Sequence, residues 1–384
     1  MSQSKRSSKD KYLDSLKKRY AKASKKERGK ILDEYVQTTG YHRKHAIALL
    51  SGQYQPAQRP IRRPRKSFYT VEDAKALDFL SDLFDGINSK RLRAAMDVEL
   101  DALYQRGVLK VSHACYRRLK RISPASIDRL RARYGQPRPK SRHRTKPGTL
   151  LKSQIPIRTW AEWNENRPGF VEMDLVGHDG GDLHGDYCLT LDFTDVKTGW
   201  TECVAVRNKA QKYVFEAIRL ARRRLPFPLL GVDSDNGSEF INDELFRYCR
   251  DEHITFTRGR SGHKNDNAYV EQKNWSAVRR FVGDLRYDTP AQLALLNQLY
   301  ERLHLYLNFF IPVMKLKEKV RTGSKVKRVY DEPQTPYARV LASADMSAKI
   351  KIQLRAQYRR LDVVKLKQEI DELVDQLWQD PHRS

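Results

Sequence analysis

Three acidic residues have the type and surroundings that metal-assisted chemistry on a phosphodiester requires. Asp174 lies in the mostly apolar run 170–176, where an unpaired carboxylate is costly unless a metal or another partner neutralises it. Asp235 ends a short apolar run, and Glu271 follows after 35 intervening residues, among Lys and Arg side chains. Carboxylates can hold two divalent cations, one activating an attacking oxygen and one stabilising the leaving oxygen. We therefore predict that Asp174, Asp235 and Glu271 bind metal and are catalytic.

Other readings of these acids stay open. The chain has 47 Asp and Glu residues in 384, so an Asp and a Glu at any fixed spacing are common by chance. Asp-Asn-Gly is also a favoured turn sequence, so Asp235 could simply cap a loop. Asp233 could be a supporting carboxylate, but we favour a plain strand-end role. Three further acids lie on or beside expected strands and compete with Asp174 as the first acid: Glu172, Asp192 and Asp195.

The charge balance points to a polyanionic partner. The chain carries 74 Lys and Arg against 47 Asp and Glu, a formal charge of +27, and residues 1–70 alone hold 19 basic and 5 acidic side chains. Such a concentrated excess favours nucleic acid over a merely solvated surface. There is no GxxxxGK[ST] motif and no apolar run of about 20 residues, so we expect no ATP hydrolysis by this chain and no membrane partner.

The pattern of cysteines indicates the cellular compartment. The four cysteines are scattered without a CxxC pair, which argues against a disulfide framework or a zinc ribbon and favours small core residues in a reducing environment. We therefore expect a cytoplasmic protein.

The first 58 residues predict a helical DNA-binding domain. Residues 9–52 read as three helices: Ser24 and Glu27 form a capping-box pattern, and Gly40 lies in the turn before a basic helix over 41–50. A helix, a short turn and a basic helix are typical of a helix-turn-helix unit. Arg43 and Lys44 would then contact DNA, although a three-helix bundle with a charged face fits the same pattern.

Two basic linkers flank a second helical unit. The first, over 59–68, alternates Pro and Arg and would lie extended, either along DNA or as a simple tether. Residues 69–134 predict a helix capped by Thr70 and Asp73, another over 89–105, and a basic helix opened by Ser112. The second linker spans 135–164. The DNA-binding candidates of the first linker and the second unit are Arg62, Arg63, Arg65, Arg117, Arg118 and Arg121.

From about 168 the pattern changes to an α/β order. The runs 170–176, 187–194 and 200–206 predict an antiparallel meander of three strands. Helices and strands then alternate: we expect helices over 209–224, 239–249, 266–282 and 290–310, and strands over 229–234 and 254–257.

The acids and their neighbours resemble those of a known family. Asp174, Asp235 in Asp-Asn-Gly-Ser-Glu-Phe, and Glu271 in Lys-Asn-Asp-Asn-Ala-Tyr-Val-Glu-Gln-Lys-Asn resemble the DDE triad of the retroviral-integrase superfamily. The pattern is most similar to that of transposases of bacterial insertion sequences, over about 165–310. The resemblance implies an RNase H-like core with a mixed five-stranded sheet and two Mg²⁺ or Mn²⁺ ions in each active site. Water would free a 3′-OH at a transposon end, and that 3′-OH would attack target DNA.

Two departures from the family matter for DNA contact. The zinc-binding His/His/Cys/Cys module of retroviral integrases is absent, so end recognition should rest on the helix-turn-helix units. Trp275 stands one turn after Glu271, where retroviral relatives often have a DNA-contacting Lys. Lys264, Lys273 and Arg279 are the basic candidates around this helix, with a solvated helix face as the alternative.

The end of the chain predicts a basic module and a helix. Residues 315–328 alternate basic and apolar side chains, which suits either a small β module on DNA or a disordered basic segment. Residues 333–337 read as a turn, and 347–378 as one long helix. Leu366, Ile370, Leu373 and Leu377 keep a spacing that suits a short coiled coil or packing back on the core.

Together these patterns predict a multidomain DNA transposase, which would act as a homo-oligomer on double-stranded DNA. A helper ATPase cannot be inferred from this chain. Two rivals are a transposase-derived DNA-binding regulator without catalysis and an RNase H-like nuclease. The expected domains are an all-α helix-turn-helix domain (1–58), a linker (59–68), a second helix-turn-helix-like domain (69–134), a linker (135–164), the catalytic core (165–310), a basic C-terminal module (311–345) and a terminal helix (346–384).

Overall fold

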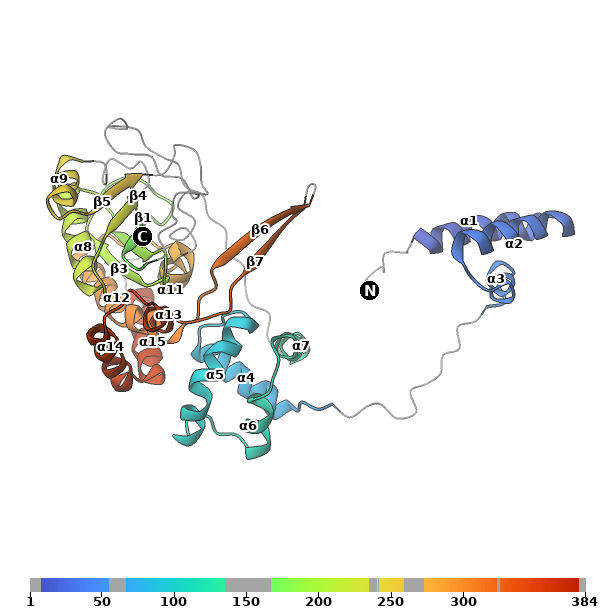
Figure 1. Ribbon diagram of the computed structural model, residues 1–384, viewed down its shortest axis with the longest axis horizontal. Helices are drawn as coiled ribbons and strands as arrows, with labels where there is room; N and C mark the ends of the chain where they lie inside the picture. Colours follow the sequence, from blue (N-terminus) through green and yellow to red (C-terminus); the bar gives the residue numbers. More distant parts are fainter. Residues whose placement is uncertain are drawn as a thin grey trace. The chain divides into compact units, whose positions relative to one another are not determined.

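The computed structural model describes most of the chain (Figure 1). The described residues are 8–54, 67–134, 167–234, 240, 242–258, 273–322 and 325–379. The chain divides into two compact units, Met1–Phe68 and Tyr69–Ser384. The helices expected as a separate domain over 69–134 thus belong to the second unit, and the linker over 135–164 lies outside the described residues. The finer domain bounds stay predictions.

The first unit contains the three expected helices: α1 (Ser8–Lys22), α2 (Lys25–Thr39) and α3 (Arg43–Leu50). Ser24 and Glu27 form the predicted capping box at the start of α2. Gly40 ends α2 with a φ of +70°, a backbone conformation that glycine adopts without steric cost. The helices bury a small core: Leu16, Ile31, Leu32, Tyr35, Ala46 and Leu50.

Four helices open the second unit: α4 (Val71–Leu83), α5 (Ser89–Gln105), α6 (His113–Leu119) and α7 (Pro124–Tyr134). The predicted cap of Thr70 and Asp73 is present on α4. The α4–α7 group joins the rest of the unit through buried contacts: the Tyr306 hydroxyl donates to the Leu83 carbonyl at 2.6 Å, and Arg91 Nε donates to the Pro312 carbonyl at 2.5 Å. These bonds fix the helices onto the sheet-bearing part.

A mixed five-stranded sheet forms the centre of the second unit, as expected. Its strands are β1 (Phe170–Gly177), β2 (Leu189–Asp195), β3 (Thr201–Val206), β4 (Gly231–Ser234) and β5 (Thr255–Arg258). Their order is β3-β2-β1-β4-β5. The first three form the predicted antiparallel meander, while β4 lies parallel to β1 and β5 parallel to β4. Every residue of β2 and β3 is buried, so both faces of this part are covered.

Helices pack on the sheet and carry the site that follows. They are α8 (Gln211–Arg224), α9 (Asp243–Asp251), η2 (Asn274–Arg279), α11 (Arg280–Val282) and α12 (Pro290–Phe310). The bounds of α8 and α12 are close to the prediction, because Pro226 follows α8 and Thr289 caps α12. The described part of the helix expected over 266–282 begins as a π-helix, not an α-helix. π-turns inside helices are rare and frequently occur at functional sites.

The C-terminal part corrects two expectations. For the basic segment over 315–328 the structure has the β alternative, a hairpin of β6 (Leu316–Thr322) and β7 (Lys325–Tyr330), and its contact with DNA stays a prediction. The turn expected over 333–337 contains the start of α13 (Pro336–Ala342). The single long helix is wrong: α14 (Ala348–Arg360) and α15 (Val363–Gln379) are separated because Asp362 caps α15, its Oδ1 accepting the Val364 N–H at 2.9 Å.

Two further expectations can be compared with the fold. All four cysteines are buried and unpaired, as small core residues are. No helix in the described ranges is long and apolar enough to cross a membrane.

Candidate active site around Asp174

Asp174 lies in the middle of β1 and is partly exposed. Both of its carboxylate oxygens are held by neighbours. The side-chain amide of Asn274 donates to Oδ2 at 2.6 Å, and the Leu175 N–H donates to Oδ1 at 2.8 Å. Since Asn274 opens η2, the first predicted acid is tied directly to the helix that follows Glu271 in the sequence.

The other two predicted acids, Asp235 and Glu271, lie outside the described residues. The structure does describe the residue just before Asp235 and the chain from Lys273 onward. Ser234, the residue before Asp235, ends β4 and is in register with Met173, the residue before Asp174. Asn274, three positions after Glu271, contacts Asp174. Two distant parts of the sequence therefore approach the same carboxylate.

Asp192 on β2 is the nearest described acid to Asp174 in the sheet. The two residues are directly opposed in the antiparallel register of β1 and β2. Asp192 is buried, and its Oδ1 accepts the Thr194 hydroxyl at 2.8 Å, while Oδ2 has no hydrogen-bond partner among the described residues. Burial raises the pKa of Asp192 to about 7; Lys273 opposes that shift and Asp174 adds to it. Sequence reasoning ranked Asp174 above Asp192, and the structure places the two side by side.

Asp195 at the end of β2, another acid that competed with Asp174 in the sequence, has a structural role. Its carboxylate accepts the Gly169 N–H at 2.8 Å and the Thr198 N–H and hydroxyl at 2.7 and 2.6 Å. These bonds close the β2–β3 turn and fix the start of β1. The Asp195 carboxylate is thus used to hold the structure together, whereas the Asp174 carboxylate is partly exposed.

Two predicted DNA contacts near Glu271 point into the protein. Lys273 Nζ donates to the Gly199 carbonyl at 3.2 Å, and burial lowers its pKa to about 8 although the Asp192 carboxylate raises it. Arg279 donates to the Gly177 carbonyl at 2.6 Å and pairs with Asp284 at 3.1 Å. Both cations hold η2 against the sheet. DNA contact by either one stays a prediction.

The remaining DNA-binding candidates fall into three groups. Lys44, Arg117 and Arg121 are exposed, and Arg43 is exposed but pairs with Asp33. Arg118 donates through Nε to both oxygens of the buried Asp73 at 2.9 Å, so it joins α6 to α4. Four candidates lie outside the described residues: Arg62, Arg63, Arg65 and Lys264.

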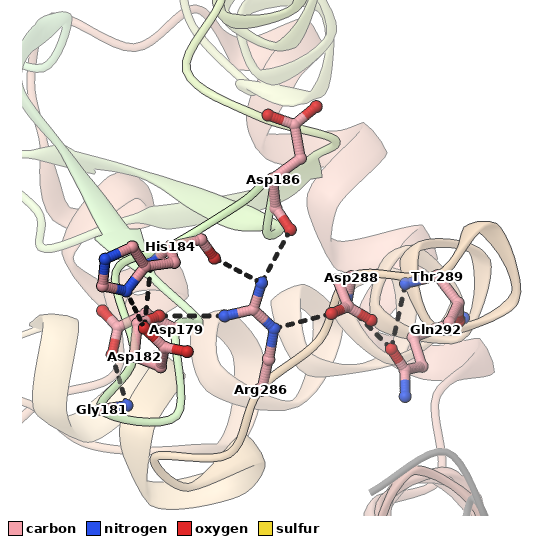
Figure 2. A network of polar contacts seen from close by, with 9 residues as sticks. All are labelled: Asp179, Gly181, Asp182, His184, Asp186, Arg286, Asp288, Thr289 and Gln292. Atoms are coloured by element: carbon pink, nitrogen blue, oxygen red, sulfur yellow. Dashed lines mark hydrogen bonds and ion pairs between the residues drawn. The ribbon is translucent and has the colours of Figure 1, made fainter. Parts of the chain in front are cut away.

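A second acidic group, in the β1–β2 loop, surrounds a cation of the protein itself (Figure 2). Arg286 donates to the carbonyls of Asp182 and His184, both at 2.9 Å, and pairs with Asp288 at 2.7 Å. Gly180 has a φ of +63°, and a Cβ there would lie 2.9 Å from the Arg286 nitrogen. Arg286 therefore fastens the loop to the segment before α12, through backbone carbonyls of the loop.

Asn274 is the site residue that sequence reasoning missed. Residues three apart share a helix face, so its position three after Glu271 was a usable signal. The electrostatic influence of Lys273 on Asp192 had no such signal, because β2 and η2 are brought together only by the fold. Among the described side chains no three His, Cys, Asp or Glu gather as metal ligands. The carboxylate of Asp174 and the unpartnered Asp192 Oδ2 are nevertheless oxygen donors of the kind that Mg²⁺ prefers.

Comparison with known proteins gives one close relative. The chain is 39% identical over 333 residues to the uncharacterized protein y4rM of Sinorhizobium fredii, covering 85% of this chain and 93% of that protein. No family model matches the chain.

Solved structures similar to this one are integrase cores. The catalytic core domain of HTLV-2 integrase in complex with magnesium is 16% identical, with a TM-score of 0.29, and the match covers 38% of this chain and 90% of that one. The core of BIV integrase is 16% identical, with a TM-score of 0.28, and the match covers 50% and 99%. At these scores function has to be argued from the chain's own residues.

Proposed function

This chain belongs to the same family as the uncharacterized protein y4rM of Sinorhizobium fredii, and we propose that it is a DDE-type DNA transposase. It would cut DNA at transposon ends and join the freed 3′-OH to target DNA by metal-dependent phosphodiester exchange. The observation that carries the proposal is the approach of two chain segments to Asp174: the end of β4, which leads into Asp235, and Asn274, which follows Glu271. The mixed five-stranded sheet is of the kind that the resemblance to an RNase H-like core implies.

The donor set fits divalent metal. Asp174, with Asp235 and Glu271, would hold Mg²⁺ or Mn²⁺, two ions in each site. Such ions activate the attacking oxygen and stabilise the leaving one. Asn274 and the Leu175 N–H would orient the Asp174 carboxylate, because each donates to a different oxygen of it. Lys273 would hold the start of η2 at a fixed distance from the sheet through the Gly199 carbonyl.

The basic character of the chain supports a DNA substrate. The formal charge is +27, and the exposed side chains of Arg43, Lys44, Arg117 and Arg121 lie on two separate helical groups. Two such groups could recognise a longer end sequence than one. We propose that the protein works as a homo-oligomer on double-stranded DNA in the bacterial cytoplasm.

A cleavage and joining assay tests the site. Purified full-length protein is incubated with a labelled duplex carrying candidate element ends, a target plasmid, and Mg²⁺ or Mn²⁺. Asp174→Asn should lower cleavage and joining by about a thousandfold, since metal-borne charge stabilisation is worth several kcal/mol. Asp235→Asn and Glu271→Gln should behave alike. Asp251→Asn, which alters an exposed acid paired with Arg250 at 3.0 Å, is the matched control and should retain activity.

The outcomes separate the rival functions. Product that persists undiminished in Asp174→Asn would refute the site. DNA binding by the wild type without any metal-dependent cleavage would favour a regulator, and cleavage of RNA–DNA hybrids without joining would favour a nuclease.

A further inference from the structure

The β6–β7 hairpin carries exposed positive charge with little to balance it. Lys317, Arg321, Lys327 and Arg328 are all exposed, and Glu318 is the one acid in the strand sequences. Figure 1 shows the hairpin standing out from the second unit as a two-stranded ribbon. These exposed cations attract an anionic partner.

The base of the hairpin is firmly held. Asp331 Oδ1 accepts the Lys315 N–H at 2.6 Å, and the Lys315 carbonyl accepts the Asp331 N–H at 2.9 Å. Arg339 on α13 pairs with the other oxygen of Asp331 at 2.7 Å and donates to the Val313 carbonyl at 3.1 Å. The ribbon thus has a defined direction.

The same base adjoins the candidate active site. Lys315 Nζ donates to the Lys197 carbonyl at 2.9 Å, in the β2–β3 turn. Two residues further along this turn, the Gly199 carbonyl accepts Lys273 Nζ at 3.2 Å. Gly199 also lies against Val313, because a Cβ there would be 3.1 Å from Val313 Cγ2. One turn therefore connects the hairpin with the start of η2 and with the neighbourhood of Asp174.

A groove of about 530 Å³ opens between α5 and β7. Its cationic lining is Lys90 and Arg93 from α5 and Lys327 and Arg328 from β7. Of its acids, Asp97 pairs with Arg93 at 2.5 Å and Asp331 is bound by Arg339, which leaves Glu332. Arg93 Nη1 is buried and has no hydrogen-bond partner among the described residues. The groove therefore has more cationic hydrogen-bond donors than acidic acceptors.

We propose that the hairpin and the α5–β7 groove bind the phosphate backbone of duplex DNA and lead it toward Asp174. This rests on the proposed function. A two-stranded ribbon with spaced cations suits the regular phosphates of a duplex, and backbone contacts of this kind position a protein without reading sequence. A protein partner fits less well, because among the described side chains of the hairpin the exposed large apolar ones are Val320 and Tyr330, too few for an interface core. The surface adds exposed cations to the inward-held Lys273 and Arg279.

The dependence of DNA affinity on salt tests this inference. A full-length variant in which Lys317, Arg321, Lys327 and Arg328 are all changed to Gln is compared with the wild type on random-sequence duplex DNA. Each phosphate contact contributes about 0.9 to the slope of log Kobs against log salt concentration, so the slope should fall by about 3 to 4. The matched control changes four exposed cations of α14 to Gln: Lys349, Arg355, Arg359 and Arg360. It loses the same charge and should keep a slope close to that of the wild type.

A second readout separates this inference from the proposed function. Asp174→Asn should bind duplex DNA with the wild-type slope and fail to cleave it. Equal slopes in the hairpin variant and the α14 control would overturn the inference, even if Asp174→Asn abolished cleavage. A reduced slope in the hairpin variant with undiminished cleavage by Asp174→Asn would uphold the inference and reject the proposed function. Circular dichroism and thermal unfolding exclude misfolding as the cause of a lost slope.

Discussion

Identical side chains on neighbouring strands acquire different chemistry from what surrounds them. Asp195 accepts two hydrogen bonds from Thr198 and one from Gly169, Asp192 lies buried with a raised pKa, and Asp174 stays partly exposed with a donor on each oxygen. Only Asp174 combines access with orientation. At the scale of single residues, candidate function therefore follows environment and not residue type.

His178 shows the same effect for a base and gives a stability prediction. It is fully buried beside β2, and its Nε2 lies 2.7 Å from the Thr190 hydroxyl. Burial, assisted by Arg279, lowers the pKa of His178 from 6.5 to about 3. The folded protein thus keeps His178 neutral at pH values where the unfolded chain protonates it. Its contribution to stability is present above pH 6.5 and is lost progressively as the pH falls toward 3.

We expect the pH dependence of folding to change in His178→Gln. When the pH falls from 7 to 5.5, the free energy of unfolding of the wild type should drop by about 1 kcal/mol because of His178. The variant lacks this drop. Urea denaturation of both proteins at the two pH values measures this difference, in which the titration of other groups cancels. A constant difference between the two proteins would contradict it.

At the scale of elements, one acid holds two helices of the second unit together. Asp73 caps α4 by accepting the Thr70 N–H at 2.6 Å and hydroxyl at 2.8 Å, and it accepts Arg118 from α6. Burial would raise the pKa of Asp73, but the hydrogen bonds from Arg118 and Thr70 hold it below the usual value. Asp73 therefore caps α4 and also forms the ion pair that joins α4 to α6.

Asp73→Ala should destabilise the second unit by about 3 kcal/mol, because it removes a cap and leaves Arg118 without its buried partner. Asp101→Ala is the comparison: Asp101 pairs with Lys120 at 2.8 Å, but both side chains are about half exposed. That change should cost far less, because a solvent-exposed ion pair contributes little to stability. Chemical denaturation of the two variants gives the values, and equal losses would show that burial of the pair is unimportant.

At the scale of the whole molecule, α15 packs back on the core. Leu366, Ile370 and Leu377 are buried, and Arg302 of α12 pairs with Glu369 at 2.7 Å. Of the two expected uses of this leucine pattern, the structure shows the packing on the core, through α12. The helix also contacts α4 and α11, so it helps to hold helices α4–α7 against the rest of the second unit.

Ile370→Asp should therefore destabilise the second unit by more than about 3 kcal/mol without dissociating an assembly. Glu372→Ala, on the exposed face of the same helix, is the control and should leave stability nearly unchanged. Thermal unfolding and sedimentation velocity of both variants test this. A fall in sedimentation coefficient with unchanged melting would show that α15 holds an oligomer instead.

Local signals were sufficient where a structure depends on neighbours in the chain. The capping patterns at Ser24 and Thr70 predicted two helix starts, and apolar runs predicted the antiparallel meander. Asp174 could be singled out because a carboxylate in a mostly apolar strand is itself unusual. The break between α14 and α15 was missed, although Asp362 is a good capping residue, because apolar spacing continued across it.

What the sequence determined, then, is the order of elements, the excess of positive charge and the acid Asp174. The tertiary structure alone decided that Asp192 faces Asp174, that Lys273 and Arg279 turn inward, and that the hairpin base meets the β2–β3 turn. The reason is physical. Periodicity and capping act over a few residues, whereas the burial, charge and hydrogen bonding of these side chains depend on groups that only the folded chain brings near.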